Sequence, residues 1–233
     1  MWEQAGKTAN LNAQWKVFSA RVHKNARGRN GFAEGNYMQR EAIIKRKTKE
    51  TDVSCEIDID GKGESEIKSG NAFLDHMLTL FVAHGLFNCR IFCKGDIEVD
   101  MHHSVEDIGI CLGEALLKAC GDKKGINRYG SSYVPMDESL ARVCCDFCGR
   151  PNLSYNVKLS SNRVNKFECE LVEDFFKAFT DHARMTLHVD LIRGRNSHHS
   201  LEAIFKAFGR ALSEACGLNL KAINAIPSSK GVL

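Results

Sequence analysis

Two kinds of hydrophobic pattern alternate along the chain from residue 41 onward. The runs EAIIKRKTKE, DVSCEIDID and NCRIFCKGDIEVD interleave polar and apolar residues, which predicts strands over 41–50, 52–60 and 88–100. The runs FLDHMLTLFVAH (73–84) and LVEDFFKAFTDH (171–182) carry apolar residues three and four positions apart, which predicts amphipathic helices. Strands followed by helices occur twice in the same order.

The second half of this pattern repeats the first. The segment HHSVEDIGICLGEALLKAC, which starts at His102, aligns without a gap on HHSLEAIFKAFGRALSEAC, which starts at His198, and ten of nineteen positions are identical. The preceding helices align as well, with Phe81 on Phe179 and His84 on His182. A duplication of this length indicates a duplicated structural unit.

We therefore expect an α+β fold made of two internally duplicated half-domains, 41–128 and 129–220. Each half would be a β-sheet with helices packed on one face. Because a unit of this size buries little core alone, the two should pack as one pseudo-symmetric single domain. Residues 221–233 follow as a C-terminal tail.

Residues 1–40 precede the duplicated part and differ from it in composition. They hold seven Lys/Arg against two Glu and show no sustained periodicity. We expect a basic, flexible N-terminal extension, whose composition is compatible with the remnant of an organelle transit peptide.

Composition narrows the class of partner. With 43% hydrophobic and 26% charged residues, and apolar runs interrupted by charges or histidines, the sequence predicts no membrane association. The 193 residues after residue 40 hold 25 basic and 27 acidic side chains, a near-neutral balance that argues against a nucleic-acid partner and favours a small polar ligand.

The ten cysteines are scattered along the chain. Cys145 and Cys148 form a CxxC, but the strand-like run LARVCCDFCG would turn residues three apart to opposite faces, so we expect no shared metal ion. No secretory signal is visible. We expect reduced, mostly buried thiols in an intracellular protein, either cytoplasmic or plastid.

Each copy of the repeated helix begins with His-His-x-x-Glu. The first His and the Glu stand four residues apart, on one helix face, where both can bind one metal ion. The second His is turned by about 100° around the axis and is expected to serve a second ion. These residues are His102, His103 and Glu106 in the first copy and His198, His199 and Glu202 in the second. The motif differs from the HExxH of zinc peptidases, and its ligand types leave the metal open among Zn, Fe, Ni, Cu and Mn.

A series of separated segments matches one known family in the same order. They are KRKTKET (45–51), FLDHML (73–78), HHSVED (102–107), GINRYG (125–130), PMDESL (135–140), GRP (149–151), TLHV (186–189), NSHHSLEAIFKAFGRAL (196–212) and PSSKG (227–231). On these segments the chain resembles the imidazoleglycerol-phosphate dehydratases of histidine biosynthesis, over about residues 41–233.

The resemblance implies dehydration of D-erythro-imidazoleglycerol phosphate to imidazole acetol phosphate at two Mn²⁺ ions per subunit. One ion would be held by His76, His103, His198 and Glu202, and the other by His102, Glu106, His199 and position 174. The family has His where this chain has Asp174, which is also the repeat partner of His76. Aspartate is a shorter ligand for a hard metal, so the second site is expected to be intact, shifted or weakened.

The implied reaction removes a proton from a carbon beside the imidazole ring, where no carbonyl acidifies it. A metal-bound imidazolate would expel the hydroxyl to give a diazafulvene-like intermediate, with the ions as Lewis acids. The resemblance makes Glu50 the general acid/base, which also contacts substrate. The other implied substrate-binding residues are His84, Arg128, Arg150, Lys206, Ser228, Ser229 and Lys230, in which cations and hydroxyls suit a phosphate.

By the same resemblance, the chains would form trimers that associate into a 24-subunit homo-oligomer, with active sites between subunits. Two other interpretations of the metal motif stay open. A dinuclear phosphohydrolase would use the ions to activate water against a phosphate ester. A duplicated metal-storage or assembly protein would leave Glu50 and the arginines without a task.

Overall fold

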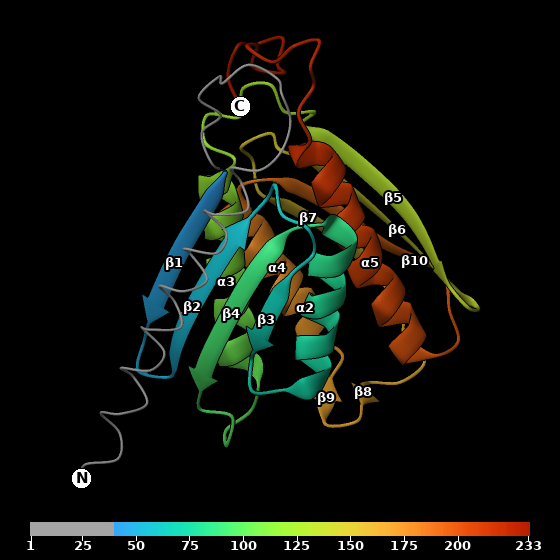
Figure 1. Cartoon of the computed structure of the whole chain (residues 1–233). Helices are drawn as coiled ribbons and strands as arrows, with labels where there is room; N and C mark the ends of the chain where they lie inside the picture. Colours follow the sequence, from blue (N-terminus) through green and yellow to red (C-terminus); the bar gives the residue numbers. More distant parts are fainter. Residues whose placement is uncertain (1–39) are drawn as a thin grey trace. The chain divides into compact units, whose positions relative to one another are not determined.

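The structure is a computed structural model, and it describes residues 40–233 (Figure 1). The predicted extension 1–40 therefore lies, apart from Arg40, outside the described residues. The first half contains β1 (Glu41–Lys47), β2 (Thr51–Asp58), β3 (Ser65–Lys68), α2 (Ala72–Gly85), β4 (Asn88–Gly95) and α3 (His102–Ala119). The second half contains β5 (Tyr129–Met136), β6 (Ser139–Asp146), β7 (Asn152–Asn156), β8 (Arg163–Val164), β9 (Phe167–Glu168), α4 (Leu171–Ala183), β10 (Thr186–Arg193) and α5 (Ser197–Cys216).

The longer strands form two four-stranded sheets with one topology. The strand orders are β1-β2-β4-β3 and β5-β6-β10-β7. In each sheet the first three strands run antiparallel, and the last strand is parallel to its neighbour. β8 and β9 form a separate short hairpin. These paired sheets and their helices confirm the α+β fold with its internal duplication.

The helices of residues 40–233 lie between the two sheets (Figure 1). Helix α3 packs on β1 and β2, and α5 packs on β5 and β6. Across the halves, α2 packs on α5 and α3 packs on α4. Each half therefore covers its sheet with helices that also need a partner from the other half.

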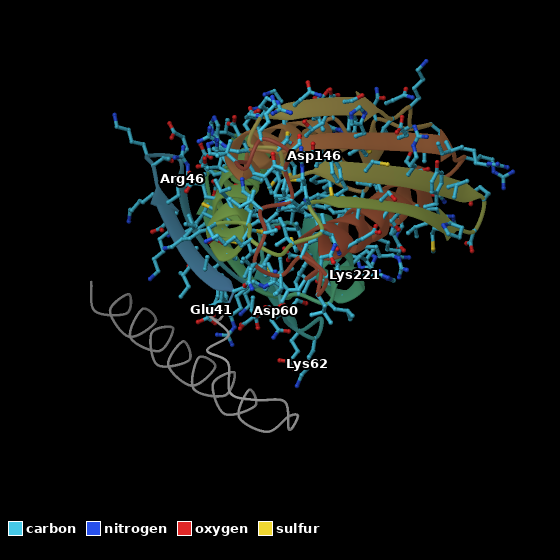
Figure 2. All side chains as sticks on the ribbon, turned by 90° about the horizontal axis from the view of Figure 1, so that it is seen from above. Glu41, Arg46, Asp60, Lys62, Asp146 and Lys221 are labelled. Carbon is cyan, nitrogen blue, oxygen red and sulfur yellow. The ribbon has the colours of Figure 1, made fainter. Side chains whose placement is uncertain are left out.

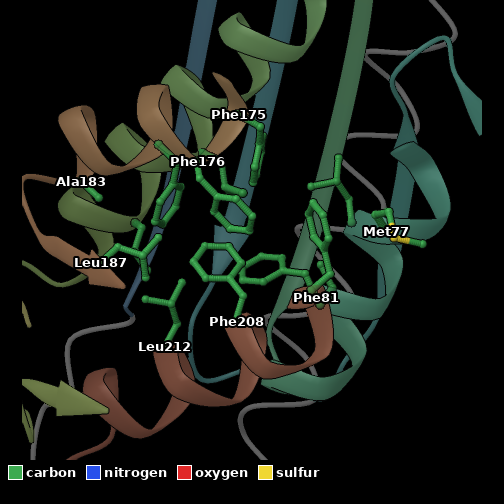
Figure 3. Packing of buried hydrophobic residues seen from close by; sticks show 14 of the residues in the cluster. Met77, Phe81, Phe175, Phe176, Ala183, Leu187, Phe208 and Leu212 are labelled. Atoms are coloured by element: carbon green, nitrogen blue, oxygen red, sulfur yellow. The ribbon is translucent and has the colours of Figure 1, made fainter. Parts of the chain in front are cut away.

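Phenylalanine side chains from these helices are among the largest fully buried side chains of the core (Figure 3). Phe81 of α2 stacks on Phe208 of α5 with ring centroids 4.9 Å apart, and Phe176 of α4 meets Phe208 edge-on at 5.0 Å. Such buried aromatic pairs add stability beyond the area they bury. The shared cluster explains why the two halves pack as one unit.

The predicted strands end earlier than their polar and apolar pattern suggests. Those expected over 41–50 and 52–60 end at Lys47 and Asp58. The strand expected over 88–100 ends at Gly95, because the chain turns directly after it, where the backbone N–H of Val99 donates to the carbonyl of Asp96 at 2.8 Å. The strand around the CxxC ends at Asp146, so Cys148 lies beyond it. The ten cysteines are free thiols, and most are buried.

Within residues 40–233, no helix combines the length and the apolar character that a membrane span requires.

Candidate metal centre

Three of the predicted ligands meet where α2 packs on α5. His76 Nε2 lies 3.0 Å from Glu202 Oε1, and His198 Nε2 lies 2.9 Å from the same oxygen. One ligand atom from each of the three lies within 4.8 Å of the others. Two imidazoles and a carboxylate that converge on one point form a donor set suited to a divalent transition metal.

The start of α5 positions His198 and His199 in the first turn of the helix. Asn196 caps the helix, and its Oδ1 accepts hydrogen bonds from the backbone N–H of His198 and His199 at 2.9 and 3.3 Å. Asparagine is a preferred residue at this position because it satisfies otherwise free backbone donors. Both side chains therefore leave the helix in its first turn, where solvent reaches them.

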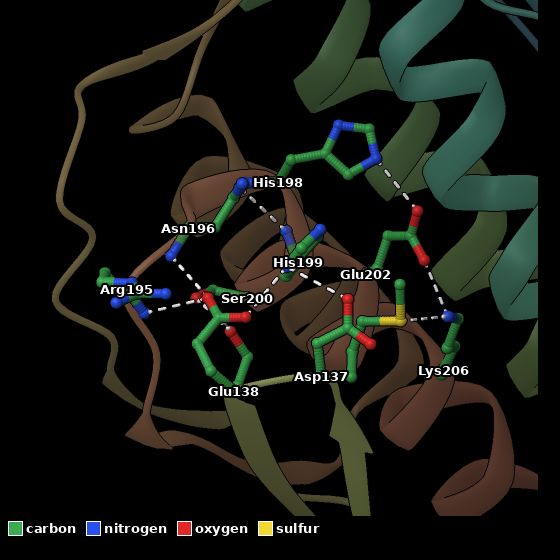
Figure 4. A network of polar contacts seen from close by, with 11 residues as sticks. Asp137, Glu138, Arg195, Asn196, His198, His199, Ser200, Glu202 and Lys206 are labelled. Atoms are coloured by element: carbon green, nitrogen blue, oxygen red, sulfur yellow. Dashed lines mark hydrogen bonds and ion pairs between the residues drawn. The ribbon is translucent and has the colours of Figure 1, made fainter.

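Glu202 is held in its ionised form by its neighbours (Figure 4). Burial of its carboxyl opposes ionisation, but hydrogen bonds from Lys206, His76 and His198 outweigh it and lower the pKa of Glu202 to about 2. Lys206 Nζ donates to Glu202 Oε2 at 2.7 Å. The lysine predicted to bind substrate therefore contacts the metal centre of its own chain.

A second group of predicted ligands lies where α3 packs on α4. His102 Nδ1 and Asp174 Oδ2 are 3.5 Å apart, and both side chains are more than 40% exposed. Glu106 follows His102 by one turn on the same helix and is exposed. Asp174 thus faces the first histidine of the α3 motif, as His76 faces that of the α5 motif.

The second histidine of each motif does not join either group. His103 Nδ1 lies 3.1 Å from an oxygen of Asp96, and His199 Nδ1 lies 3.0 Å from Glu138 Oε2. The hydrogen bonds with Asp96 and Glu138 raise the pKa of each histidine, and His199 and backbone donors lower the pKa of Glu138 to about 2. Asp137, Glu138 and His199 form a further cluster of metal-ligand type.

Sequence reasoning had not singled out Asp96, Asp137 or Glu138. The three residues lie in connections, Asp96 between β4 and α3 and the other two between β5 and β6. The equivalence of the two hairpins was the available signal for Glu138. It lies in the two-residue turn before β6, as Glu50 lies in the two-residue turn before β2.

Glu50 lies in the turn between β1 and β2, next to the α3 motif. Thr48 Oγ1 accepts the Glu50 backbone N–H at 3.1 Å, and Thr51 donates its hydroxyl to Asp107 of α3. Arg46 holds the other oxygen of Asp107 at 2.7 Å. These contacts fix the turn on the helix that carries the first motif, while the side chain of Glu50 is exposed.

The predicted phosphate-binding residues gather at the other end of α5. Arg128 pairs with Asp146 at 2.6 Å and donates to the carbonyl of Pro227 at 2.9 Å, next to Ser228. Figure 2 labels Asp146 among the side chains of the molecule. Ser229 and Lys230 are exposed. The Gly149 backbone, beside Arg150, lies against the terminal Leu233.

The length of α5 separates these two groups of residues within one chain. From His198 to Cys216 the helix rises by about 27 Å at about 1.5 Å per residue, and the tail follows Cys216. The remaining candidate is His84, whose pKa is lowered by burial and by the positive charges of Lys206 and Arg210. A substrate of a few ångströms cannot touch the centre and the tail of the same chain.

Comparisons with known proteins point to a single family. The family model described as imidazoleglycerol-phosphate dehydratase matches residues 69–212. A relative of that name from Caldanaerobacter subterraneus subsp. tengcongensis is 56% identical over 194 residues, which cover 83% of this chain and all of the relative. Another from Hahella chejuensis is 50% identical over 195 residues, 84% of this chain and 99% of the relative.

Two solved structures of proteins with that name share the fold. The Staphylococcus aureus N315 structure superposes with a TM-score of 0.69 at 47% identity, over 77% of this chain and 98% of the other. The Pyrococcus furiosus structure gives a TM-score of 0.70 at 35% identity, over 82% and 100%.

Proposed function

The chain belongs to the imidazoleglycerol-phosphate dehydratase family of histidine biosynthesis, and from this premise we propose that it dehydrates D-erythro-imidazoleglycerol phosphate at two Mn²⁺ ions. The product would be imidazole acetol phosphate. The observation that carries the proposal is the convergence of His76, His198 and Glu202 on one point at the solvent-facing end of α2 and α5.

The donor set supports a pair of divalent ions. His76, His198 and Glu202 would hold one ion, and His102, Glu106 and Asp174 would contribute to the other. The mixture of imidazoles with carboxylates suits manganese, and the ionised Glu202 supplies negative charge. When bound, the ions would act as Lewis acids that orient the imidazole ring of the substrate and stabilise its loss of a proton.

We propose that a second copy of the chain completes each ion's coordination. His103 would complete the set of His76, His198 and Glu202, and His199 would complete the α3–α4 set. Support comes from placement, because each of these histidines is partly exposed and bonded on its Nδ1 side to a carboxylate of its own chain. A homo-oligomer follows, and the family resemblance favours a 24-mer built from trimers.

Glu50 would act as the general acid/base. Its turn is fixed to α3 by the Thr51–Asp107 contact, so the carboxylate is carried at a constant place beside the first motif. An exposed carboxylate there can return a proton to the hydroxyl that departs from the carbon attached to the ring, and take the proton from the next side-chain carbon to give the enol of the product.

The phosphate of the substrate would bind at the tail of a neighbouring chain. Arg128, Arg150, Ser228, Ser229 and Lys230 offer guanidinium, ammonium, hydroxyl and backbone donors at that end of the fold. Bidentate arginine contacts suit a phosphate group. Lys206 and His84 lie on the metal side and would contact the other end of the substrate.

A single assay tests the proposed reaction against its alternatives. Purified protein with Mn²⁺ is incubated with imidazoleglycerol phosphate, and the ketone is read by ultraviolet absorbance after base treatment while free phosphate is measured in parallel. The ketone without phosphate is expected. Free phosphate without the ketone would identify a phosphohydrolase, and bound metal without either product would identify a storage protein. Glu50→Gln serves as the matched control, because it should keep the metal content and lose turnover.

A further inference from the structure

Glu138 and Glu50 occupy the same position in two equivalent hairpins. Lys47 pairs with Asp52 in the first hairpin, and Pro135 pairs with Leu140 in the second, so the strands align with a constant offset. Inside these pairs Met136 pairs with Ser139, and the backbone N–H of Thr48 donates to the carbonyl of Thr51, so each turn consists of two residues, of which the second is a glutamate. Two glutamates at one position of a duplicated fold invite a comparison of what each touches.

Glu138 uses both carboxylate oxygens within its own half (Figure 4). Oε1 accepts the backbone N–H of Asn196 at 2.7 Å and that of Arg195 at 3.3 Å. Oε2 lies 3.0 Å from Nδ1 of His199. The carboxylate therefore links the connection before α5 to the second histidine of the motif and leaves only Nε2 of that histidine available.

The first half reaches the same arrangement from a different element. His103 Nδ1 lies 3.1 and 3.2 Å from the two oxygens of Asp96, in the connection of 96–101 between β4 and α3. The corresponding connection of the second half is shorter, at 194–196. The duplicated halves thus place a carboxylate on the same ring nitrogen from non-equivalent positions, which inheritance from a common ancestor of the halves does not explain.

The use of Asp96 in place of a hairpin glutamate changes what Glu50 is required to do. Since Asp96 holds His103, the hairpin glutamate of the first half has no such task, and its carboxylate makes no hydrogen bond within residues 40–233. The contact between Thr51 and Asp107 holds the turn of Glu50 on α3, the helix that carries His103.

We propose that Glu138 and Asp96 are positioning residues for His199 and His103. They hold each histidine with its proton on Nδ1, so that Nε2 is turned outward as a metal ligand. Because Asp96 holds His103, Glu50 is free for proton transfer. This inference rests on the proposed function, since it assigns each histidine to a metal ion completed by a second copy. A histidine ligand commonly donates its other N–H to a carboxylate, which fixes the tautomer and the ring plane.

Direct chelation by the cluster of Asp137, Glu138 and His199 is the competing explanation. It conflicts with the contacts of Glu138, because one oxygen is already shared by two backbone donors and the other meets an imidazole nitrogen at hydrogen-bond distance. Asp137 is 70% exposed and lies 3.7 Å from the same nitrogen without a hydrogen bond. The two explanations differ in what they require of Asp137.

The experiment compares Glu138→Gln with Asp137→Asn in the full chain. In Glu138→Gln the amide oxygen can stay on the backbone donors, so the NH₂ group faces Nδ1 and favours the tautomer with its proton on Nε2. We expect affinity for Mn²⁺ at one of two sites to fall about 10- to 100-fold, measured by metal titration. Asp137→Asn removes the same charge beside the same ring, and we expect a change of less than about fivefold.

The tautomer is read separately by ¹⁵N NMR of histidine-labelled, metal-free protein. Wild type and Asp137→Asn should show His199 protonated on Nδ1, and Glu138→Gln should shift it to Nε2. The first half gives the same test with Asp96→Asn and its control Glu98→Gln, which covers a failure of Glu138→Gln to fold.

Unchanged Mn²⁺ affinity and tautomer in both Glu138→Gln and Asp96→Asn would overturn the inference. Equal weakening by Asp137→Asn and Glu138→Gln would replace it with direct chelation. Failure of the proposed function looks different, because the wild-type protein itself would then bind no Mn²⁺ or form no ketone, whereas the tautomer of His199 is measured without metal or activity.

Discussion

Gly209 of α5 lies against the backbone carbonyl of Phe81 on α2, so closely that a methyl group in place of its hydrogen would come within 2.3 Å of that oxygen. The repeat partner of Gly209 is Gly113 of α3, which lies in the same way against the carbonyl of Phe179 on α4. These two contacts set the spacing of the two helix pairs that carry the proposed metal ligands.

Gly209→Ala should therefore push α5 away from α2. Backbone cannot move aside as a flexible side chain can, so we expect a loss of about 1–3 kcal/mol of unfolding free energy in chemical denaturation. Arg210→Ala on the same helix is the control, because Arg210 is exposed and its loss should change stability little. Equal stability of Gly209→Ala and wild type would show that the helices separate without cost.

Glu202→Gln should remove the ion held by His76, His198 and Glu202. Elemental analysis should find one ion fewer per chain, and turnover should be lost.

The pKa of Glu202, about 2, lies below its value of 4.5 in the unfolded chain. Its ionisation therefore stabilises the native state above about pH 4.5, and this contribution disappears as the pH falls toward 2. In metal-free protein, the stability difference between wild type and Glu202→Gln should narrow over that window. A difference independent of pH would contradict the assignment.

Asp174→Ala should weaken the ion bound on the α3–α4 side, whereas Asp174→His should preserve or tighten it. The aspartate faces His102 at 3.5 Å, and a histidine would restore the residue type that its repeat partner, His76, provides. Metal titration of both variants makes the comparison. His182→Ala is the control on the same helix, because its Nδ1 is bonded to the Ala178 carbonyl. Two tightly held ions in Asp174→Ala would remove Asp174 from the ligands.

Chelation of the metal should dissociate the particle as well as abolish activity. If each ion joins ligands of two copies, sedimentation velocity of the metal-free protein should show smaller oligomers that reassemble when Mn²⁺ is added. Acid should act in the same direction, because histidine must be neutral to bind a metal. A large particle that survives full metal removal would show that the ions serve catalysis alone.

Removal of residues 228–233 should raise KM for the substrate by at least about tenfold, because charged hydrogen bonds to a phosphate each contribute about 1.5–3 kcal/mol. Metal content should not change, since the tail lies a helix length from the ligands of its own chain. Lys221→Ala, at the exposed start of the tail and outside the removed residues, is the control. An unchanged KM in the truncated protein would contradict the role of Ser228, Ser229 and Lys230.

The sequence predicted the helices and part of the centre because both depend on periodicity and on one short motif. The helix predicted over 73–84 is Ala72–Gly85, the one predicted over 171–182 is Leu171–Ala183, and α3 begins at His102. His198 and Glu202 meet because four residues make about one helical turn. His76 joined them in the prediction through the family resemblance alone.

Asp96 and Glu138 could not be predicted in the same way. Both lie in connections, where no periodicity exists, and their contacts depend on how far a strand extends before it turns. The alternating pattern of 88–100 suggested that Asp96 belonged to a strand, whereas the chain turns at Asp96, whose carbonyl accepts the backbone N–H of Val99 and whose carboxylate meets His103. The ligand sets of both ions remain predictions, because their proposed fourth members come from another copy.

The separation along α5 also has a genetic consequence. A chain that lacks Glu202 keeps an intact tail, and a chain that lacks residues 228–233 keeps the proposed metal ligands at the opposite end of α5. If neighbouring chains share each active site, a mixed particle of the two inactive chains contains some sites in which one contributes the metal ligands and the other the phosphate clamp. Two alleles that each fail alone should then restore growth without histidine when they are expressed together in one cell.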